Sequence, residues 1–244
     1  TEPDVYLVLD EDFNTLASLG ALKNLDMLVG GDKEFDSNVF YSSVYKAGQY
    51  EGSQYALPME CNPTLMFVNK TLLQKEGIKV PDNDWTWDDF YDICKTIVKD
   101  SDGDGQMDQF GCYDYTWLQA VYSNGITPFN QSGTSSNFLD EKFSQSLEFV
   151  KRLEATNRNY QVTSNDFDLG KVAFRPFTFS DYRTYMPYPW RIKKYSGFEW
   201  TCIRMPAGPS GDNRSEMSAL MAGMSSRTEK KQCAWDFVKL LTTD

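Results

Sequence analysis

Short apolar runs alternate with amphipathic helical segments along this 244-residue chain, and this alternation limits the fold more than any other feature. VYLVL at residues 5–9 is a continuous apolar run, typical of a strand that is covered on both faces of its sheet. Residues 87–97 have apolar side chains at helical spacing, and Thr86 with Asp89 has the spacing of a capping box at the start of this helix. Strands that alternate with helices predict an α/β fold.

The same patterns predict the other elements. Helical spacing and stop signals indicate further helices near residues 13–19, 71–78, 117–123, 140–156 and 226–241. Ser226 and Glu229 have capping-box spacing and are expected to start the last of these helices. Apolar runs predict further strands in YALPME (55–60), TLMFVNK (64–70), GKVAFRPF (170–177), FEWTCIRMP (198–206) and SALMAGM (218–224). We expect a turn at Cys61-Asn62-Pro63, between the first two of these strands.

The side-chain inventory excludes several kinds of chemistry. The chain has no histidine, which rules out Ser-His-Asp catalysis, Cys-His catalysis and histidine-based zinc sites. The cysteines form no CxxC pair, so we expect buried free thiols rather than zinc ribbons, redox motifs or a disulfide framework. They are Cys61, Cys94, Cys112, Cys202 and Cys233. No phosphate-binding glycine motif is present, which argues against nucleotide binding.

Charge and hydropathy limit the partners. With 35 acidic and 24 basic residues the net charge is -11, which disfavours nucleic acid and anionic membranes as partners. The mean hydropathy of -0.52 and the lack of a long apolar run predict no transmembrane helix. The chain opens on a strand and closes inside a helix, without a signal peptide or lipid-attachment cysteine. We therefore expect it to be an internal piece of a longer protein.

KDSDGDGQMDQFG, residues 99–111, has the spacing of a calcium-binding loop. Its candidate oxygen ligands are Asp100, Asp102, Asp104, Gln106 (through its backbone carbonyl) and Asp108. Gly111 stands where an EF-hand has its bidentate glutamate, and the residues after it have an extended pattern. We expect a structural calcium ion that does not switch the fold; the alternative is an acidic, solvated turn without an ion.

Aromatic residues in polar, non-periodic segments are candidates for stacking on sugar rings. They are Tyr113, Tyr115, Trp117, Phe179, Tyr182, Tyr185 and Trp190. As a group they favour a binding cleft, although for any one of them alone core packing is the better explanation. Trp85 and Trp87 differ, because they flank a helix start, and are expected to pack in the core.

Polar residues follow two of the predicted strands. The carboxylates at 10–12 come directly after the first strand, and ligands in open α/β sheets bind beyond such strand ends. Glu60 and Asn62 stand at the end of another strand. The alternative for residues 10–12 is a solvated turn or a helix cap. Paired carboxylates also leave open the hypothesis of a glycosidase, in which one carboxyl group acts as the acid and another as the base.

Several segments, in order along nearly the whole chain, resemble the carbohydrate-type extracellular solute-binding proteins of ABC importers, the group that includes maltose-binding protein. The hinge passage of that family resembles YALPMECNPTLMFVNKTLLQKEGI, with Val68 where tyrosine is usual. The other similar segments are PDVYLVLDEDFNTLASLGAL, PDNDWTWDDF, DSDGDGQMDQFG, GKVAF and SALMAGMSSRTEKKQCAWDFVKLL.

The resemblance implies two α/β lobes joined by hinge strands, which close on a ligand in the manner of a flytrap. Residues 1–66 plus 216–244 would form the first lobe and residues 67–215 the second. The usual first strand-helix units and the C-terminal helices of the family would be absent, so the first lobe is expected to be incomplete. A partly exposed sheet edge of that lobe could drive dimerisation or swapping.

The resemblance also implies a function: the substrate-binding component of an ABC importer, which carries a sugar or oligosaccharide to permease subunits without catalysis. The implied location is extracellular, as a cell-surface lipoprotein, or periplasmic. The positions that match ligand-binding positions of the family are Glu11, Asp12, Glu60, Asn62, Tyr113, Asp114, Trp117, Phe179 and Tyr182. The alternatives are a secreted glycoside hydrolase and a calcium-dependent carbohydrate-binding or dockerin-type module, although a dockerin needs two such loops.

Overall fold

The computed structural model describes residues 2–130, 132–185 and 197–243, without the side chains of residues 184 and 185. The chain forms two compact units. Unit 1 comprises Thr1–Asn62, Phe129–Ser135 and Met217–Asp244, and unit 2 comprises Pro63–Pro128 and Ser136–Glu216. The lobes were predicted to divide at residues 66 and 216, and the units divide at residues 62 and 216. In addition, Phe129–Ser135 belongs to unit 1, whereas the prediction assigned it to the second lobe with the rest of the middle of the chain.

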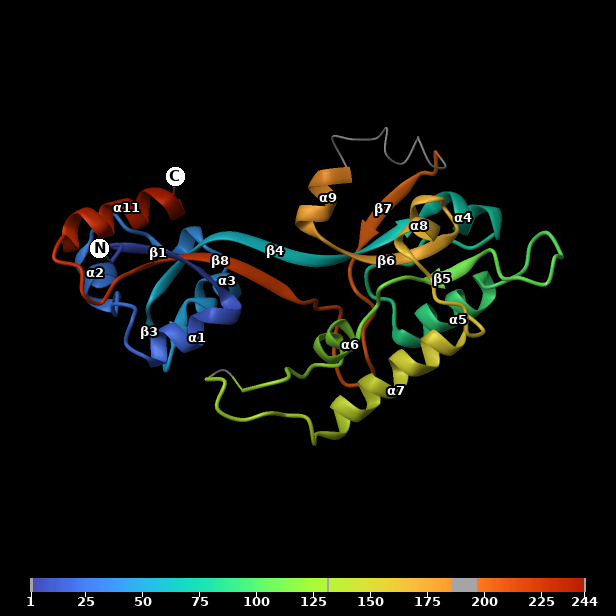
Figure 1. Cartoon of the computed structure of the whole chain (residues 1–244), viewed down its shortest axis with the longest axis horizontal. Helices are drawn as coiled ribbons and strands as arrows, with labels where there is room; N and C mark the ends of the chain where they lie inside the picture. Colours follow the sequence, from blue (N-terminus) through green and yellow to red (C-terminus); the bar gives the residue numbers. More distant parts are fainter. Residues whose placement is uncertain (1, 131, 186–196, 244) are drawn as a thin grey trace. The chain divides into compact units, whose positions relative to one another are not determined.

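Unit 1 is a sheet between two helical layers (Figure 1). Strand β1 (Val5–Leu9) pairs antiparallel with β8 (Met217–Met224), and β4 (Ala56–Asn69) follows in the strand order. Helix α1 (Asp10–Ser18) packs on one face and α11 (Lys231–Thr243) on the other. The smaller elements are α2 (Asp26–Gly31), the 3-10 helix η1 (Ser37–Val39), α3 (Ser42–Ala47) and the hairpin of β2 (Gln49–Tyr50) and β3 (Ser53–Gln54).

Unit 2 is built on the second half of β4. Strands β6 (Val172–Thr178) and β7 (Trp200–Ile203) pair with it antiparallel, and β5 (Phe110–Cys112) pairs parallel with β6. The helices are α4 (Lys70–Lys75), α5 (Trp87–Ile97), α6 (Trp117–Ser123), α7 (Glu141–Ala155), α8 (Ser164–Asp168) and α9 (Phe179–Tyr185). Its core is mainly aromatic, with the rings of Trp87 and Phe149 stacked at 4.2 Å between centroids. The predicted α/β class is confirmed.

Most local predictions are confirmed. Thr86 and Asp89 form the predicted capping box of α5, and Trp85 and Trp87 are 4% and 5% exposed, as expected of core residues. All five cysteines are free thiols, although only Cys94 and Cys112 are buried. Among the described residues, no helix combines the length and apolar character needed to cross a bilayer.

The predicted turn at residues 61–63 is wrong. β4 runs without interruption from Ala56 to Asn69. Proline weakens a strand only where its missing N–H would have donated to a neighbour. Pairing continues directly after Pro63, because the backbone N–H of Thr64 donates to the carbonyl of Glu216 at 2.9 Å.

The predicted cap of the last helix is also wrong. α11 begins at Lys231, beyond both Ser226 and Glu229. The hydroxyl of Thr228 accepts from the backbone N–H of Lys230 at 3.1 Å and donates to the carboxylate of Asp4 at 2.7 Å. A contact to a residue at the far end of the chain thus fixes this helix start.

We predict that Gly111→Ala destabilises unit 2. A Cβ at this position of β5 would lie 2.4 Å from Cβ of Cys94 on α5, and neither element can yield without moving backbone. The expected loss is about 1–3 kcal/mol in the free energy of unfolding, typical of overpacked cores. Gly30→Ala is the matched control, since nothing lies within 4 Å of that Cβ in α2, and it should be neutral or slightly stabilising. Urea unfolding followed by circular dichroism measures both, and equal midpoints for the two variants would contradict the prediction.

We predict that the Asp32 carboxylate makes unit 1 sensitive to acid. Hydrogen bonds from Lys239 Nζ at 2.5 Å, from Trp235 Nε1 at 2.8 Å and from the backbone N–H of Glu34 lower the pKa of Asp32 to about 2. Because the folded-state pKa lies below the ordinary value of 3.8, this stabilisation is complete above that pH and is lost as the pH falls towards 2. Asp32→Asn should therefore be less stable than wild type at neutral pH, and the difference should shrink on acidification. A difference in unfolding free energy that stays constant with pH would contradict this.

Candidate functional site

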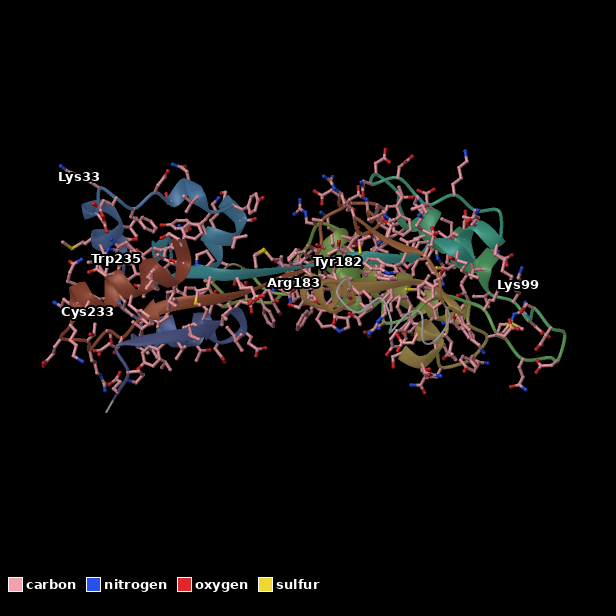
Figure 2. All side chains as sticks on the ribbon, turned by 90° about the horizontal axis from the view of Figure 1, so that it is seen from above. Lys33, Lys99, Tyr182, Arg183, Cys233 and Trp235 are labelled. Carbon is pink, nitrogen blue, oxygen red and sulfur yellow. The ribbon has the colours of Figure 1, made fainter. Side chains whose placement is uncertain are left out.

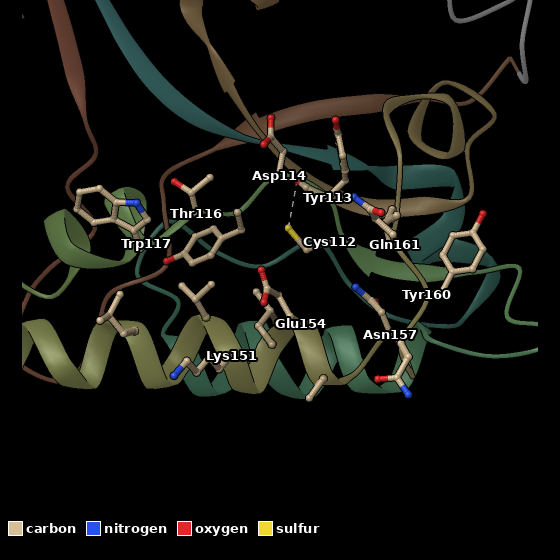
Figure 3. A pocket seen from close by; sticks show the side chains of 17 residues that line it. Cys112, Tyr113, Asp114, Thr116, Trp117, Lys151, Glu154, Asn157, Tyr160 and Gln161 are labelled. Carbon is tan, nitrogen blue, oxygen red and sulfur yellow. Dashed lines mark hydrogen bonds between the residues drawn. The ribbon is translucent and has the colours of Figure 1, made fainter.

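A cavity of about 770 Å³ lies in unit 2, beyond the carboxyl end of β5 (Figure 3). Three segments line it: the loop 112–116 with the start of α6, one side of α7, and the irregular segment 157–162. β5 is parallel to β6, so this is the kind of strand end at which open α/β sheets bind ligands.

The loop after β5 has a constrained backbone. The N–H of Tyr113 donates to the carbonyl of Phe174 at 3.0 Å, which extends the pairing with β6 by one residue. Asp114 then adopts φ of 64°, a left-handed conformation that costs energy for a residue other than glycine. The kink turns the chain towards α6 and leaves Tyr113 and Asp114 on the wall of the cavity.

A capping box fixes the start of α6. The hydroxyl of Thr116 accepts from the N–H of Leu118 at 3.3 Å, and the side chain of Gln119 accepts from the N–H of Thr116 at 2.9 Å. This places Trp117 at the first position of the helix, where its indole is 41% exposed and borders the cavity. A large apolar ring held at the mouth of a cavity is suited to stacking on a ligand.

Helix α7 supplies the opposite wall. Val150 and Leu153 are buried and contribute apolar surface, whereas Lys151 and Glu154 contribute charge to the same wall (Figure 3). One carboxylate and one ammonium group on α7 face the cavity that Asp114 also lines. The lining therefore combines apolar surface with hydrogen-bonding groups, some positively and some negatively charged.

The segment 157–162 completes the cavity. The Oδ1 atom of Asn157, a lining residue, is buried and has no hydrogen-bond partner among the described residues. The Tyr160 ring stacks on Phe110 at 4.6 Å between centroids, and its hydroxyl donates to Asp166 at 3.5 Å. Burial and the adjacent Asp166 raise the pKa of Tyr160, so its hydroxyl stays protonated.

Two potential nucleophiles in the described lining, Cys112 and Tyr115, are not activated. The thiol of Cys112 donates to the carbonyl of Tyr113 at 3.6 Å, and burial raises the pKa of this thiol well above its usual range. Tyr115 is 5% exposed, and burial likewise raises its pKa. Of the predicted stacking residues, Tyr115 is thus a core residue, in contact with Ser123 at 3.5 Å through its hydroxyl.

The predicted ligand residues fall into separate groups. Glu11 and Asp12 are exposed in the first turn of α1, and Glu60 and Asn62 lie in the less buried middle of β4, all four in unit 1. In unit 2, the structure brings Tyr113, Asp114 and Trp117 together around the cavity.

Phe179 and Tyr182 form a second aromatic group in unit 2. Their rings stack on α9 with centroids 5.8 Å apart, and Tyr182, which Figure 2 labels, also meets the Trp200 ring edge-on with centroids 5.5 Å apart. Neither residue is among those that line the cavity of about 770 Å³. Trp190, predicted with them, lies outside the described residues.

The acidic loop draws three of its carboxylates together. Oxygen atoms of Asp100, Asp102 and Asp108 lie within 4.8 Å of one another. Asp100 accepts from the N–H groups of Gly103 at 2.6 Å and Gly105 at 2.7 Å, contacts that lower its pKa and favour the charged form. Hard cations such as calcium prefer such oxygen ligands.

A fourth predicted ligand, Asp104, is outside this group. The carboxylate of Asp104 accepts from the N–H of Gln106 at 2.8 Å and is not part of the group formed by the other three aspartates. The chain continues into β5, which agrees with the extended pattern expected after Gly111.

Sequence reasoning missed most of the polar and aromatic lining of the cavity. Lys151, Glu154, Asn157 and Gln161 carry no signal, because a polar residue on a helix or loop reads the same whether it faces solvent or a cavity. Tyr160 could have been predicted as a lining residue, because it is an aromatic residue in a polar, non-periodic segment. The same pattern indicated Trp117.

Comparison with known proteins identifies the family of this chain. The family model described as bacterial extracellular solute-binding protein matches residues 1–244. The chain is also similar in structure to the ABC substrate-binding protein Lmo0181 from Listeria monocytogenes, solved in complex with cycloalternan, with a TM-score of 0.73, 21% identity, and coverage of 99% of this chain and 62% of that one.

Two further structures are similar. UspC from M. tuberculosis has a TM-score of 0.77 at 16% identity, with 99% of this chain and 64% of that chain covered. The sugar-binding protein MalE from Xanthomonas citri has a TM-score of 0.75 at 17% identity, with 98% and 61% covered. The chain thus spans about three fifths of the length of the solved structures that it matches.

Proposed function

Since the chain belongs to the bacterial extracellular solute-binding protein family, we propose that it is the substrate-binding part of an ABC importer that takes up a sugar or oligosaccharide. It binds the ligand without changing it and passes it to permease subunits in the membrane. The cycloalternan complex of the similar Listeria protein and the sugar-binding description of the Xanthomonas protein support this ligand class.

The observation that carries the proposal is the composition of the unit 2 cavity. Sugars present flat apolar faces and rims of hydroxyl groups, so their sites need rings together with fixed donors and acceptors. Trp117 supplies an exposed ring, and Asp114 and Glu154 supply carboxylates that accept from hydroxyls. Cys112 is held as a neutral thiol and the chain has no histidine, which favours binding over catalysis.

The proposal also includes the remaining predicted ligand residues as contacts to the sugar. In unit 1 these are Glu11, Asp12, Glu60 and Asn62, and in unit 2 Phe179 and Tyr182. The family description supports a location outside the cytoplasmic membrane, either periplasmic or as a cell-surface lipoprotein.

We predict that isothermal titration with a panel of gluco- and manno-oligosaccharides gives saturable binding, with the sugar recovered intact. Trp117→Ala should weaken binding about tenfold or more, since the loss of one stacking ring costs about 1.4 kcal/mol. Trp117→Phe keeps a ring and should lose less, and Leu139→Ala, at a fully exposed position of unit 2, is the matched control. Hydrolysed sugar would identify a glycosidase instead. Unchanged affinity in Trp117→Ala would show that the sugar does not bind in this cavity.

We further propose that the acidic loop binds calcium through Asp100, Asp102 and Asp108. Calcium that binds only the folded chain stabilises it, by about 2.7 kcal/mol at one hundred times its dissociation constant. We predict a higher melting temperature in calcium than in chelator, an effect lost in Asp100→Asn and Asp102→Asn. Asp104→Asn is the control and should retain the shift, because that carboxylate is outside the group. A melting temperature that calcium leaves unchanged in the wild type would refute the site.

A further inference from the structure

Helix α6 carries Trp117 at the border of the cavity, and the opposite end of this helix is held from two sides. Asn124, which follows the helix, donates through Nδ2 to the carbonyl of Lys142 at 2.9 Å and accepts through Oδ1 from the N–H of Ser210 at 3.0 Å. These contacts join the end of α6 to α7 and to the loop after β7. They lie about 10 Å along the helix axis from Trp117, so the position of its ring depends on contacts at the start of the helix.

At the start of α6, one contact touches the indole of Trp117 and another fixes its backbone. The Trp117 ring lies tilted against the Phe143 ring of α7, with centroids 5.8 Å apart. The backbone is fixed by the capping box, in which Gln119 Oε1 accepts from the N–H of Thr116 at 2.9 Å and from its hydroxyl at 2.5 Å. Since this hydroxyl donates its proton to Gln119, its oxygen is left to accept from the N–H of Leu118. The capping box therefore requires the amide oxygen of Gln119 to face Thr116.

The carboxylate of Glu216 selects this orientation of the Gln119 amide. An amide can turn over, and its nitrogen would then meet the N–H of Thr116, so that two donors would face each other. In the observed orientation Gln119 Nε2 donates to Glu216 Oε2 at 3.0 Å. An ionised carboxylate accepts hydrogen bonds and does not donate them, so turning the amide would break this contact as well. One neighbour that only donates and one that only accepts thus specify a single orientation of the amide.

Glu216 is in turn fixed to the sheet of unit 2. It directly precedes β8, and its carbonyl accepts from the N–H of Thr64 on β4 at 2.9 Å. Thr64 is 5% exposed and pairs with Thr178 of β6. The chain enters β8 beside α6 (Figure 1), and here the carboxylate reaches the first turn of the helix that carries Trp117. A path of hydrogen bonds therefore runs from β4 through Glu216 to the start of α6.

The environment of this path strengthens it. Thr116, Gln119 and Glu216 are all partly buried, where water competes less for hydrogen bonds than at an open surface. A hydrogen bond to an ionised carboxylate is also stronger than one between neutral groups. Neither Gln119 nor Glu216 is among the residues that line the cavity. Their effect on a ligand would therefore act through the helix start.

We propose that Glu216 is a positioning residue for the ligand. By selecting the orientation of the Gln119 amide, it holds the start of α6, and with it the Trp117 ring, in the place where that ring stacks on the sugar. This inference rests on the proposed function, in which Trp117 is the stacking residue. A ring that is fixed before the ligand arrives avoids part of the ordering cost of binding. Loss of the contact should therefore weaken binding, although both residues lie outside the cavity lining.

The test exchanges the two side-chain groups. Gln119→Glu keeps an oxygen for the capping box but turns a second carboxylate towards Glu216, and the two charges repel each other. Isothermal titration with maltotriose and with mannotriose should show affinity weakened about fivefold or more. Adding Glu216→Gln should return the affinity to within about twofold of wild type, because the amide at position 216 then donates to the carboxylate at position 119.

The matched control makes the same change in unit 1. Gln232 Nε2 donates to Asp236 at 2.9 Å on α11, so Gln232→Glu also places two carboxylates face to face. It should leave the sugar affinity unchanged.

Fluorine NMR measures the position of the ring without any sugar. In a chain labelled with fluorotryptophan, the resonance that disappears in Trp117→Phe belongs to Trp117. It should be a single line in wild type, broadened or split in Gln119→Glu, and single again in the double variant. Glu216→Ala removes the carboxylate without adding a charge and should also broaden it. A contact that only stabilised the fold would lower the melting temperature and leave the line single.

An unchanged affinity and an unchanged Trp117 line in Gln119→Glu would overturn the proposal, and so would a double variant that restores neither. If the wild type binds neither trisaccharide, the proposed ligand class fails. The fluorine line then decides by itself whether Glu216 positions the Trp117 ring.

Discussion

Both units depend on the continuity of β4. Ala56 and Leu57 at its start are fully buried in the core of unit 1, and Met66, Phe67 and Val68 near its end are fully buried in unit 2. Residues 59–63 between them are only partly buried or exposed. A strand keeps its ladder through such a stretch because backbone pairing does not require a buried side chain. The same continuous strand thus contributes core residues to both units.

The cavity of unit 2 depends in turn on aromatic packing beneath it. The guanidinium of Arg175 on β6 lies 4.9 Å from the Tyr113 ring and 4.5 Å from Phe177, distances at which a cation is attracted to a ring face. Tyr113 is thereby held on the sheet from one side, while on the far side of the cavity Tyr160 is held on Phe110. Two rings of the lining are therefore fixed by the core before any ligand arrives, and a preformed site avoids part of the ordering cost of binding.

Local signals in the sequence predict local structure well, and non-local contacts account for the errors. The capping box of Thr86 and Asp89 needs only neighbouring residues and is confirmed, whereas the turn expected at Pro63 is overridden by Glu216, a pairing partner far along the chain. Tyr113 and Tyr115 look alike in the sequence and both border the cavity, yet Tyr115 is buried in the core whereas Tyr113 is only partly buried. Which of the two faces outward depends on the kink at Asp114, and a conformation stabilised by the surrounding fold leaves no mark in composition or periodicity.

The acidic loop illustrates how a motif and its surroundings combine. Lys99 and Gln109 close its base with paired backbone hydrogen bonds, and both side chains contact Glu76. Lys75 of α4 adds a hydrogen bond to Gln109 at 2.7 Å, so the base of the loop is already tied to a helix without an ion. A cation between the three clustered aspartates would relieve their mutual repulsion within the loop. Because the base is fixed and a strand rather than a helix follows, the loop has no hinged element to move, and the proposed ion would stabilise the fold without switching it.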